Sequence, residues 1–251
     1  MSIQIGISGW QYREFRGIFY PKGVKPAEML AYYARHFSAV ELNASFYRFL
    51  ADSSYDKWRD ETPEGFVIAV KANRYFTHFH RLSDPKELWK GFLAQTRRLG
   101  HKLGPILFQT HPSMKADLAR LRLFLRHIGR GHDFVFEFRH PSWFQEPVYE
   151  LLHSFGAAFC VYDLRASHSP VLTTSNTAYV RLHGPTEEPY VGSYSDRQLE
   201  QWARQARAWD AEGRDVYIFF DNTMNGDAII NARDLVAKIW PKTNIGFTIN
   251  P

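Results

Sequence analysis

The stretch AVELNASFYR, residues 39–48, starts as an apolar β-strand and ends in polar residues. Glu41 and Asn43 are two residues apart, so on a strand both side chains share one face. A carboxylate on the buried face of a strand is costly unless a partner neutralises it or a reaction uses it. The stretch therefore predicts that other polar groups gather around Glu41.

The same pattern recurs along the chain, where short β-rich runs alternate with helix-like segments. The predicted strands are Ile3–Ser8, Ala39–Asn43, Phe66–Lys71, Pro105–Gln109, Phe134–Phe138, Phe159–Asp163, Ala178–His183 and Val216–Asp221. The predicted helices are Pro26–His36, Tyr55–Glu61, Pro85–Leu99, Lys115–Arg130, Pro147–Phe155, a weak segment near Ser169–Ser175, Asp196–Glu212 and Ala228–Ile239. Eight strand–helix units in 251 residues predict an α/β fold, a (β/α)8 TIM barrel with a parallel eight-stranded sheet.

An open doubly wound sheet is the alternative fold. Its first turn would be IGISGWQY, residues 5–12, which lacks a GxGxxG fingerprint, and no GxxxxGK[ST] motif occurs in the chain. No low-complexity linker interrupts the series of strands and helices. We therefore predict a single barrel domain over residues 1–251.

Composition restricts the class of protein further. No segment approaches the roughly 18 apolar residues of a membrane helix, and the N-terminus lacks the features of a signal peptide, so we predict a cytoplasmic protein with no membrane partner. The single cysteine, Cys160, excludes an intramolecular disulfide framework and a cysteine-clustered metal site. The net charge is +5 and the isoelectric point is near 9.2, which fits either a nucleic-acid partner or a basic cytoplasmic enzyme.

Nearly every predicted strand is apolar at its start and polar at its end. In a parallel barrel all carboxyl ends lie on one rim, and that rim carries the active site in enzymes of this fold. Side chains two apart share a face, so the polar strand ends are predicted to converge on one cavity. They are Glu41, Lys71, Gln109, Glu137, Arg139, Asp163, His183 and Asp221.

Side-chain chemistry suggests a role for each of these groups. The cations would hold anionic oxygens of a substrate, and they are Lys71, Arg139 and Arg181. The predicted catalytic groups would transfer protons, and they are Glu137, Glu41, His183 and Asp221. We also expect substrate contacts from Asn43, Gln109, Tyr47, Trp10, Trp143 and Tyr190.

Three other interpretations of the same residues stay open. The cofactor is unknown, but a divalent metal could be held by Glu137, Asp163, His183 and Asp221, although no compact HExxH-like signature supports it. Lys71 could form a Schiff base, although its spacing does not favour this role over anion binding. The charges could also pair with one another across neighbouring strands and serve structure alone.

Aromatic residues frame the rim in the predicted loops. They make up 16% of the chain, and large rings in such loops suit stacking on a base or a sugar. We expect Phe46 and Phe144 to pack in the hydrophobic core between the loops and the barrel instead. The loop KANRYFTHFHRL, residues 71–82, adds a basic segment suited to phosphate.

The ordered motifs of the chain resemble the YecE-like family, also described as domain of unknown function 72. The resemblance extends from about Ile5 to about Ala232 and is carried by IGISGWQYREFRGIFYP, VELNASFYR, VIAVKANRYFTHFHRL, GPILFQTHPSM, FEFRHPSWF, VRLHGP, YVGSYSDRQL and VYIFFDNTMNGDAIINA. It implies a TIM barrel distantly similar to xylose-isomerase-like and endonuclease IV-like barrels, and it implies no settled reaction. The residues that match the family are Gly9, Trp10, Glu41, Asn43, Phe46, Tyr47, Lys71, Asn73, Gln109, Glu137, Arg139, His140, Asp163, Arg181, His183, Gly184, Asp221 and Asn222.

One position departs from the family pattern, because His111 stands before Pro112 where the family tends to have a proline pair. We expect the substitution to affect local rim geometry or substrate range rather than the fold.

Three functions compete at this point. The leading prediction is an enzyme that acts by acid/base chemistry on a small anionic, phosphorylated or sugar-like substrate. The alternatives are a nucleic-acid-binding or abasic-site-processing protein, and a barrel that binds a ligand without catalysis.

Overall fold

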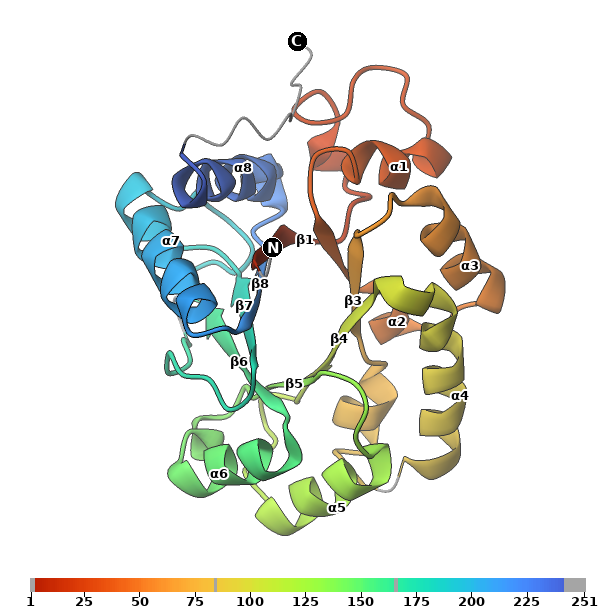
Figure 1. The fold of residues 1–251 in the computed structure, drawn as a ribbon, viewed down its shortest axis with the longest axis vertical. Helices are drawn as coiled ribbons and strands as arrows, with labels where there is room; N and C mark the ends of the chain where they lie inside the picture. The colour runs from red at the N-terminus through yellow and green to blue at the C-terminus, as the bar shows by residue number, and fades with distance from the viewer. Residues whose placement is uncertain (1–2, 84, 165–166, 242–251) are drawn as a thin grey trace.

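The computed structural model of the protein describes residues 3–83, 85–164 and 167–241, and shows eight parallel strands that close into a barrel (Figure 1). The strands are β1 (Ile3–Ser8), β2 (Ala39–Leu42), β3 (Val67–Lys71), β4 (Leu103–Gln109), β5 (Phe134–Glu137), β6 (Ala158–Asp163), β7 (Thr177–Leu182) and β8 (Asp215–Phe220). They pair in chain order, and β8 pairs with β1. The predicted (β/α)8 barrel is confirmed, with strand bounds within two residues of the prediction, and the open sheet is wrong.

Helices surround the strands on the outside of the barrel (Figure 1). They are α1 (Met29–Tyr33), α2 (Ala44–Tyr47), α3 (Asp52–Glu61), α4 (Lys86–Thr96), α5 (Leu118–Ile128), α6 (Glu146–Phe155), α7 (Asp196–Ala211) and α8 (Asp227–Ile239). The predicted first helix is shorter because Pro26–Glu28 forms a 3-10 turn, and the single-turn α2 was not predicted.

The connection between β6 and β7 differs from the prediction. The described residues of this segment, 164 and 167–176, contain no helix, so the weak helix near Ser169–Ser175 is wrong. Two hydroxyl side chains bond instead to the backbone of the β6 region: Thr174 Oγ1 donates to Ala157 O at 2.7 Å, and Ser169 Oγ accepts from Tyr162 N at 2.9 Å. Hydroxyl groups that bond to backbone in this way compete with helix formation.

The interior of the barrel has an apolar middle and a polar top. Small and apolar side chains from the strands fill the middle, and they are Ala39, Ala69, Leu107, Val135, Ala158, Cys160, Tyr179 and Phe219. Glu41, Glu137 and Arg181 each follow one of these residues by two positions, so they point inward at the carboxyl end. The apolar middle layer therefore forms the floor beneath the polar groups.

The structure does not describe every residue of the predicted domain. Residues 1–2, 84, 165–166 and 242–251 lie outside the described residues, so the domain boundary 1–251 stays a prediction. Among the described residues, none of the helices has the length and apolar character needed to cross a membrane.

Candidate active site at the mouth of the barrel

The guanidinium of Arg181, at the end of β7, lies at the centre of the polar layer. It bonds to three carboxylates from three other strands: Glu41 Oε1 lies 2.8 Å from Nη2, Glu137 Oε2 lies 2.8 Å from Nη1, and Asp221 Oδ2 lies 3.0 Å from Nη2. The side chain is 1% exposed. A buried ion pair is tolerated only when its hydrogen bonds are satisfied, and Arg181 meets that condition with all three nitrogens engaged.

Both carboxylate oxygens of Glu41 accept hydrogen bonds from neighbouring side chains. Besides Arg181, Ser8 Oγ donates to Oε1 at 2.7 Å and Tyr179 OH donates to Oε2 at 2.7 Å. No part of the Glu41 side chain is exposed. The partners expected around Glu41 are therefore present, and they leave no oxygen free to receive a proton from a substrate. This geometry favours a positioning role for Glu41 over the predicted proton transfer.

Glu137, at the end of β5, is held in a similar way. Gln109 Nε2 donates to Oε1 at 2.8 Å, Arg139 Nε bonds to the same oxygen, and Arg181 bonds to Oε2. Burial alone would raise the pKa of Glu137, but the guanidinium groups of Arg139 and Arg181 hold the pKa well below its usual range. Glu137 is thus an ionised anchor for two arginines and a weak base.

His183 and Asp221 form a dyad beside Arg181. His183 Nδ1 lies 2.9 Å from Asp221 Oδ2, and His183 Nε2 lies 3.0 Å from Arg139 Nη2 and 3.3 Å from Arg181 Nη1. Burial and the charge of Arg181 lower the pKa of His183, so the imidazole is neutral. We assign its lone pair to Nε2, which faces the guanidinium groups, and its proton to Nδ1, which lies close to the Asp221 carboxylate but outside hydrogen-bond geometry.

Lys71, the last residue of β3, has a different environment from the arginines. Its Nζ lies 4.3 Å from the centroid of the Phe46 ring, and within the described residues no hydrogen bond or ion pair reaches Nζ. The residue is 7% exposed. Burial and the charge of Arg181 lower the pKa of Lys71 from 10.5 to about 8. Lys71 is thus a nearly buried amine at the mouth of the barrel that contacts an aromatic ring but has no hydrogen-bond or ion-pair partner among the described residues.

The loop after β7 brings Tyr190 over the dyad. Tyr190 N donates to His183 O at 2.8 Å, and the two rings are 5.7 Å apart. The turn requires Gly184, which has a φ of +112°, because a Cβ there would lie 2.5 Å from Val191 O. Tyr190 itself has a φ of +69°, so the loop holds the residue in a strained conformation next to the site.

Exposed side chains continue the mouth above α2 and β3. Tyr47 is 64% exposed, and the Arg74 guanidinium lies 6.0 Å from its ring and 5.3 Å from the Phe79 ring. Burial, His111 and Lys71 lower the pKa of His78 to about 4, so this imidazole is neutral. Arg74 adds a positive charge to the rim, where its guanidinium lies near the Tyr47 and Phe79 rings.

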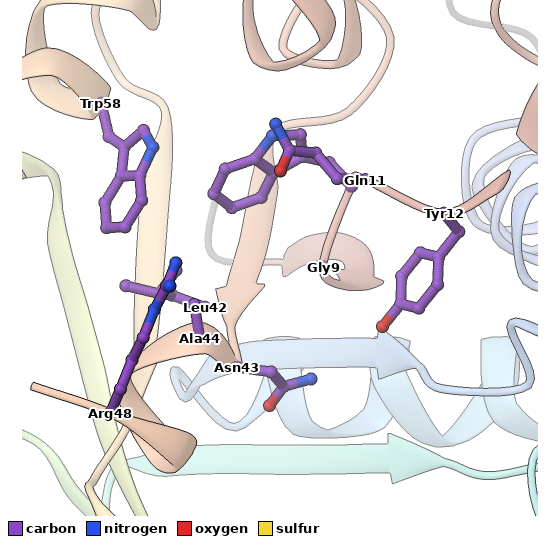
Figure 2. A pocket seen from close by; sticks show the side chains of 9 residues that line it. Gly9, Gln11, Tyr12, Leu42, Asn43, Ala44, Arg48 and Trp58 are labelled. Atoms are coloured by element: carbon purple, nitrogen blue, oxygen red, sulfur yellow. The ribbon is translucent and has the colours of Figure 1, made fainter. Parts of the chain in front are cut away.

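A cavity of about 260 Å³ opens at the ends of β1 and β2. Trp10 and Trp58, 5.6 Å apart, line it together with Arg48. Figure 2 shows the Tyr12 hydroxyl and the Asn43 amide directed toward a common space away from Trp58. Burial and the nearby Asp221 carboxylate raise the pKa of Tyr12, so its hydroxyl stays protonated.

Two predicted site residues lie elsewhere. Trp143 is 0% exposed, stacks on Phe138 at 4.4 Å and donates from Nε1 to Met114 O at 2.7 Å, so it packs in the core and the predicted ligand contact is wrong. Asp163 pairs in register with Leu182, whereas Tyr162 pairs with the inward Arg181. The side chain of Asp163 therefore faces α7, outside the barrel.

The predicted metal set does not fit this arrangement. Asp163 faces away, and the Arg181 guanidinium occupies the space between the carboxylates of Glu137 and Asp221. Across residues 3–83, 85–164 and 167–241 no group of three or more histidine, cysteine or acidic side chains has the geometry of a metal site. The positive charge that a metal would supply is already provided by an arginine.

The sequence reasoning missed three residues that shape the site. Ser8 and Tyr179 bond to Glu41, and the Tyr162 ring lies 4.7 Å from the Arg139 guanidinium. Ser8 is the last residue of β1 and Tyr179 precedes Arg181 by two residues, so the alternation of strand side chains could have placed both inward.

Comparison with known proteins gives whole-chain similarity to one family. The UPF0759 protein YunF of Bacillus subtilis is 31% identical over 267 residues, which cover 93% of this chain and 93% of YunF. The UPF0759 protein YecE of Escherichia coli K12 is 26% identical over 174 residues, which cover 66% of this chain and 61% of YecE.

Solved structures agree with these matches. The crystal structure of a DUF72 family protein from Thermotoga maritima superposes with a TM-score of 0.82 at 30% identity and covers 96% of this chain and 99% of that one. A DUF72 family protein from Enterococcus faecalis gives a TM-score of 0.82 at 18% identity, with 96% of each chain covered. The family profile described as "Protein of unknown function DUF72" matches residues 4–245. The resemblance to the YecE-like proteins is therefore confirmed, and the chain belongs to the DUF72 family.

Proposed function

We propose that this protein is an enzyme that binds a small anionic substrate, phosphorylated or sugar-like, at the mouth of the barrel and acts on it by acid/base chemistry. One observation carries the proposal: among the described residues the buried carboxylates are all paired with a cation, whereas one cation near the mouth, Lys71, has no carboxylate partner. Glu41, Glu137 and Asp221 are used by Arg181, but Lys71 has no anionic partner within the described residues. An ammonium group that no carboxylate contacts is available to pair with an anionic ligand.

The chemistry would centre on the His183–Asp221 dyad. In the structure, Arg139 Nη2 lies 3.0 Å from His183 Nε2. A substrate anion that bound Arg139 would draw its guanidinium away and leave Nε2 with only the longer contact of 3.3 Å to Arg181 Nη1, so that the Nε2 lone pair could accept a proton. Asp221 would stabilise the imidazolium through Nδ1–H. Tyr190, whose ring lies against His183, would cover the reacting groups.

Isothermal titration calorimetry with inorganic phosphate and glucose 6-phosphate tests the anion site. The wild type is expected to bind at low ionic strength, and Lys71→Met is expected to weaken binding about tenfold, which is about 1.4 kcal/mol. Lys90→Met is the matched control, because Lys90 is exposed and paired with Glu87, and its binding should be unchanged. The proposal fails if the wild type binds neither anion.

Turnover is tested separately from binding. Native mass spectrometry of the purified protein would identify a retained small molecule, and that molecule defines the substrate class for assays. We expect Asp221→Asn to abolish turnover while anion binding persists. Tight capture of the molecule by the wild type without any turnover would identify a ligand-binding barrel instead of an enzyme.

A nucleic-acid partner is the second candidate, and the rim residues favour it. Arg74 lies between the exposed rings of Tyr47 and Phe79, an arrangement suited to stacking with unpaired bases beside a phosphate. Fluorescence anisotropy with a labelled single-stranded oligonucleotide tests it, with Arg74→Ala and Tyr47→Ala compared to the wild type. Salt-dependent binding that both substitutions weaken supports this function, and no binding at low salt excludes it.

A further inference from the structure

Two of the lysines that the structure describes are nearly buried, and their surroundings differ. Lys102 is 6% exposed, and its ammonium group donates to the backbone carbonyls of Arg59 and Thr62. Lys71 is 7% exposed, and within the described part of the chain its ammonium group has no such acceptor. Lys102 is therefore a structural lysine that ties two segments together, whereas structure alone does not explain Lys71.

The position of Lys71 is that of a group aimed at a ligand. It follows Val67 and Ala69 on the inner face of β3, so its side chain enters the barrel at the carboxyl end. The charges of Arg181, Glu137 and Asp221 all act on it. The Phe46 ring covers one side of the ammonium group. In this position the amine of Lys71 is available to contact a substrate, because no acceptor among the described residues binds it.

The chemical state of the amine also differs from that of a surface lysine. Burial and the neighbouring Arg181 guanidinium bring the pKa of Lys71 to about 8. About one tenth of the molecules then carry a neutral amine at pH 7. Desolvation and a neighbouring cation are the two devices by which proteins activate a lysine as a nucleophile.

We propose that Lys71 is a nucleophile that forms an imine with a carbonyl group of the substrate. This inference rests on the proposed function and narrows its substrate to a small anion that carries an aldehyde or ketone. The placement of a 7% exposed amine on the inner face of β3 at its carboxyl end, with no hydrogen-bond or ion-pair partner among the described residues, carries it.

The step balances without an external oxidant or reductant. The Nζ lone pair attacks the carbonyl carbon, and an N–C bond forms as the C=O π electrons move to oxygen, which takes up a proton. The C–O bond of this carbinolamine then breaks, and the oxygen leaves as water with the two hydrogens that the amine has lost. Protonation of the imine nitrogen gives an iminium ion, which withdraws electrons from the adjacent carbon. The His183–Asp221 dyad is then placed in the same mouth to remove a proton from that carbon.

Reductive trapping tests the proposal. The wild-type protein is incubated with glyoxylate or with glyceraldehyde 3-phosphate in the presence of sodium cyanoborohydride, and the modified lysines are identified by peptide mass spectrometry. We expect Lys71 to be labelled at least tenfold faster than Lys90, and we expect inorganic phosphate to slow the labelling of Lys71. Labelling of Lys71 no faster than Lys90 with both probes overturns the proposal.

A second variant separates this inference from the anion site. Lys71→Arg retains the positive charge but has no nucleophilic amine, so it should bind inorganic phosphate within about threefold of the wild type and should not be trapped at position 71. Circular dichroism checks that the variant is folded. If the wild type binds phosphate but is not trapped at Lys71, only the imine is wrong. If it neither binds phosphate nor is trapped, the proposed anion site is wrong as well.

Discussion

Arg181 Nε and Nη2 bind the two oxygens of Glu41 at 3.0 and 2.8 Å, although the residues are 140 positions apart in the chain. This pair joins β2 to β7 across the interior of the barrel. Because both side chains are buried, loss of Arg181 would leave Glu41 without its cation, and loss of Glu41 would remove one of the three carboxylates that neutralise Arg181.

Glu41→Gln is expected to destabilise the protein by about 3–5 kcal/mol, because Arg181 would lose a buried anionic partner. Urea denaturation followed by circular dichroism measures the change. Arg181→Met is expected to cost more than Glu41→Gln, because Glu41, Glu137 and Asp221 would all lose this cation. A single variant as stable as the wild type would show that the pair does not hold the strands together.

Lys71→Met is expected to raise the free energy of unfolding by about 1–2 kcal/mol at pH 7, because it removes a buried ammonium without a partner. The folded-state pKa of about 8 lies below the ordinary 10.5, so the unfolded chain binds more protons between these values. Wild-type stability therefore rises with pH across that window, and the advantage of the variant shrinks. Urea titrations at pH 7 and pH 10 measure both effects.

Lys102→Met is the matched control for that substitution. Lys102 is buried to a similar extent, but its ammonium donates to Arg59 O and Thr62 O. The variant should lose about 1–3 kcal/mol, since the buried Thr62 carbonyl loses its ammonium donor and the Arg59 carbonyl loses one of its two side-chain donors. The opposite signs of the two substitutions would show that Lys71 is kept at a cost to stability. Equal destabilisation would contradict this.

The imidazole of His183 is expected to stay neutral below its ordinary pKa of 6.5, because burial and Arg181 disfavour its charged form. As the pH falls below 6.5, the unfolded chain takes up a proton at this residue before the folded protein does, so stability decreases. NMR titration of the His183 ring gives the pKa directly. Arg139→Gln should raise this pKa and Asp221→Asn should lower it further, and a ring that titrates at 6.5 in all three proteins would be inconsistent with the dyad.

Trp143→Ala and Tyr190→Ala should distinguish a residue of the hydrophobic core from a residue of the rim, because the first should affect stability and the second ligand binding. Trp143 is fully buried, and its truncation is expected to cost about 3–5 kcal/mol. Tyr190 is 42% exposed, so its truncation should cost less than about 1 kcal/mol but should impair phosphate binding or turnover. Thermal unfolding and calorimetry measure the two properties. A destabilised Tyr190 variant with normal binding would assign this residue to structure.

Alternation along the strands made the barrel and its inward residues predictable from the sequence. The position of Glu41 could be derived in this way, since it follows Ala39 by two residues on β2. Its partner could not, because the register that brings Arg181 opposite Glu41 depends on closure of the whole barrel. Local reasoning could only offer several carboxylates and several cations near one another.

The two misplaced residues have separate physical reasons. Asp163 ends β6 one position beyond the inward Tyr162, so the same polar strand end points to the helices instead. Trp143 follows Arg139 by only four residues, but the 3-10 turn at Pro141–Trp143 directs its ring into the core. In both cases the local backbone conformation decides whether the side chain points to the barrel mouth or away from it. The residue types alone do not reveal that conformation.

The central position of Arg181 has a consequence for how the chain can be divided. A fragment that ended after β4 would contain Glu41 but only the first four strands of the barrel. The complementary fragment would contain Arg181 together with Glu137 and Asp221. The amino-terminal piece would carry an unpaired anion, and the carboxyl-terminal piece would have lost one of the three acceptors of its guanidinium. Each half would thus be less stable alone than joined, and mixing the two halves should restore the complete barrel by drawing these opposite charges together.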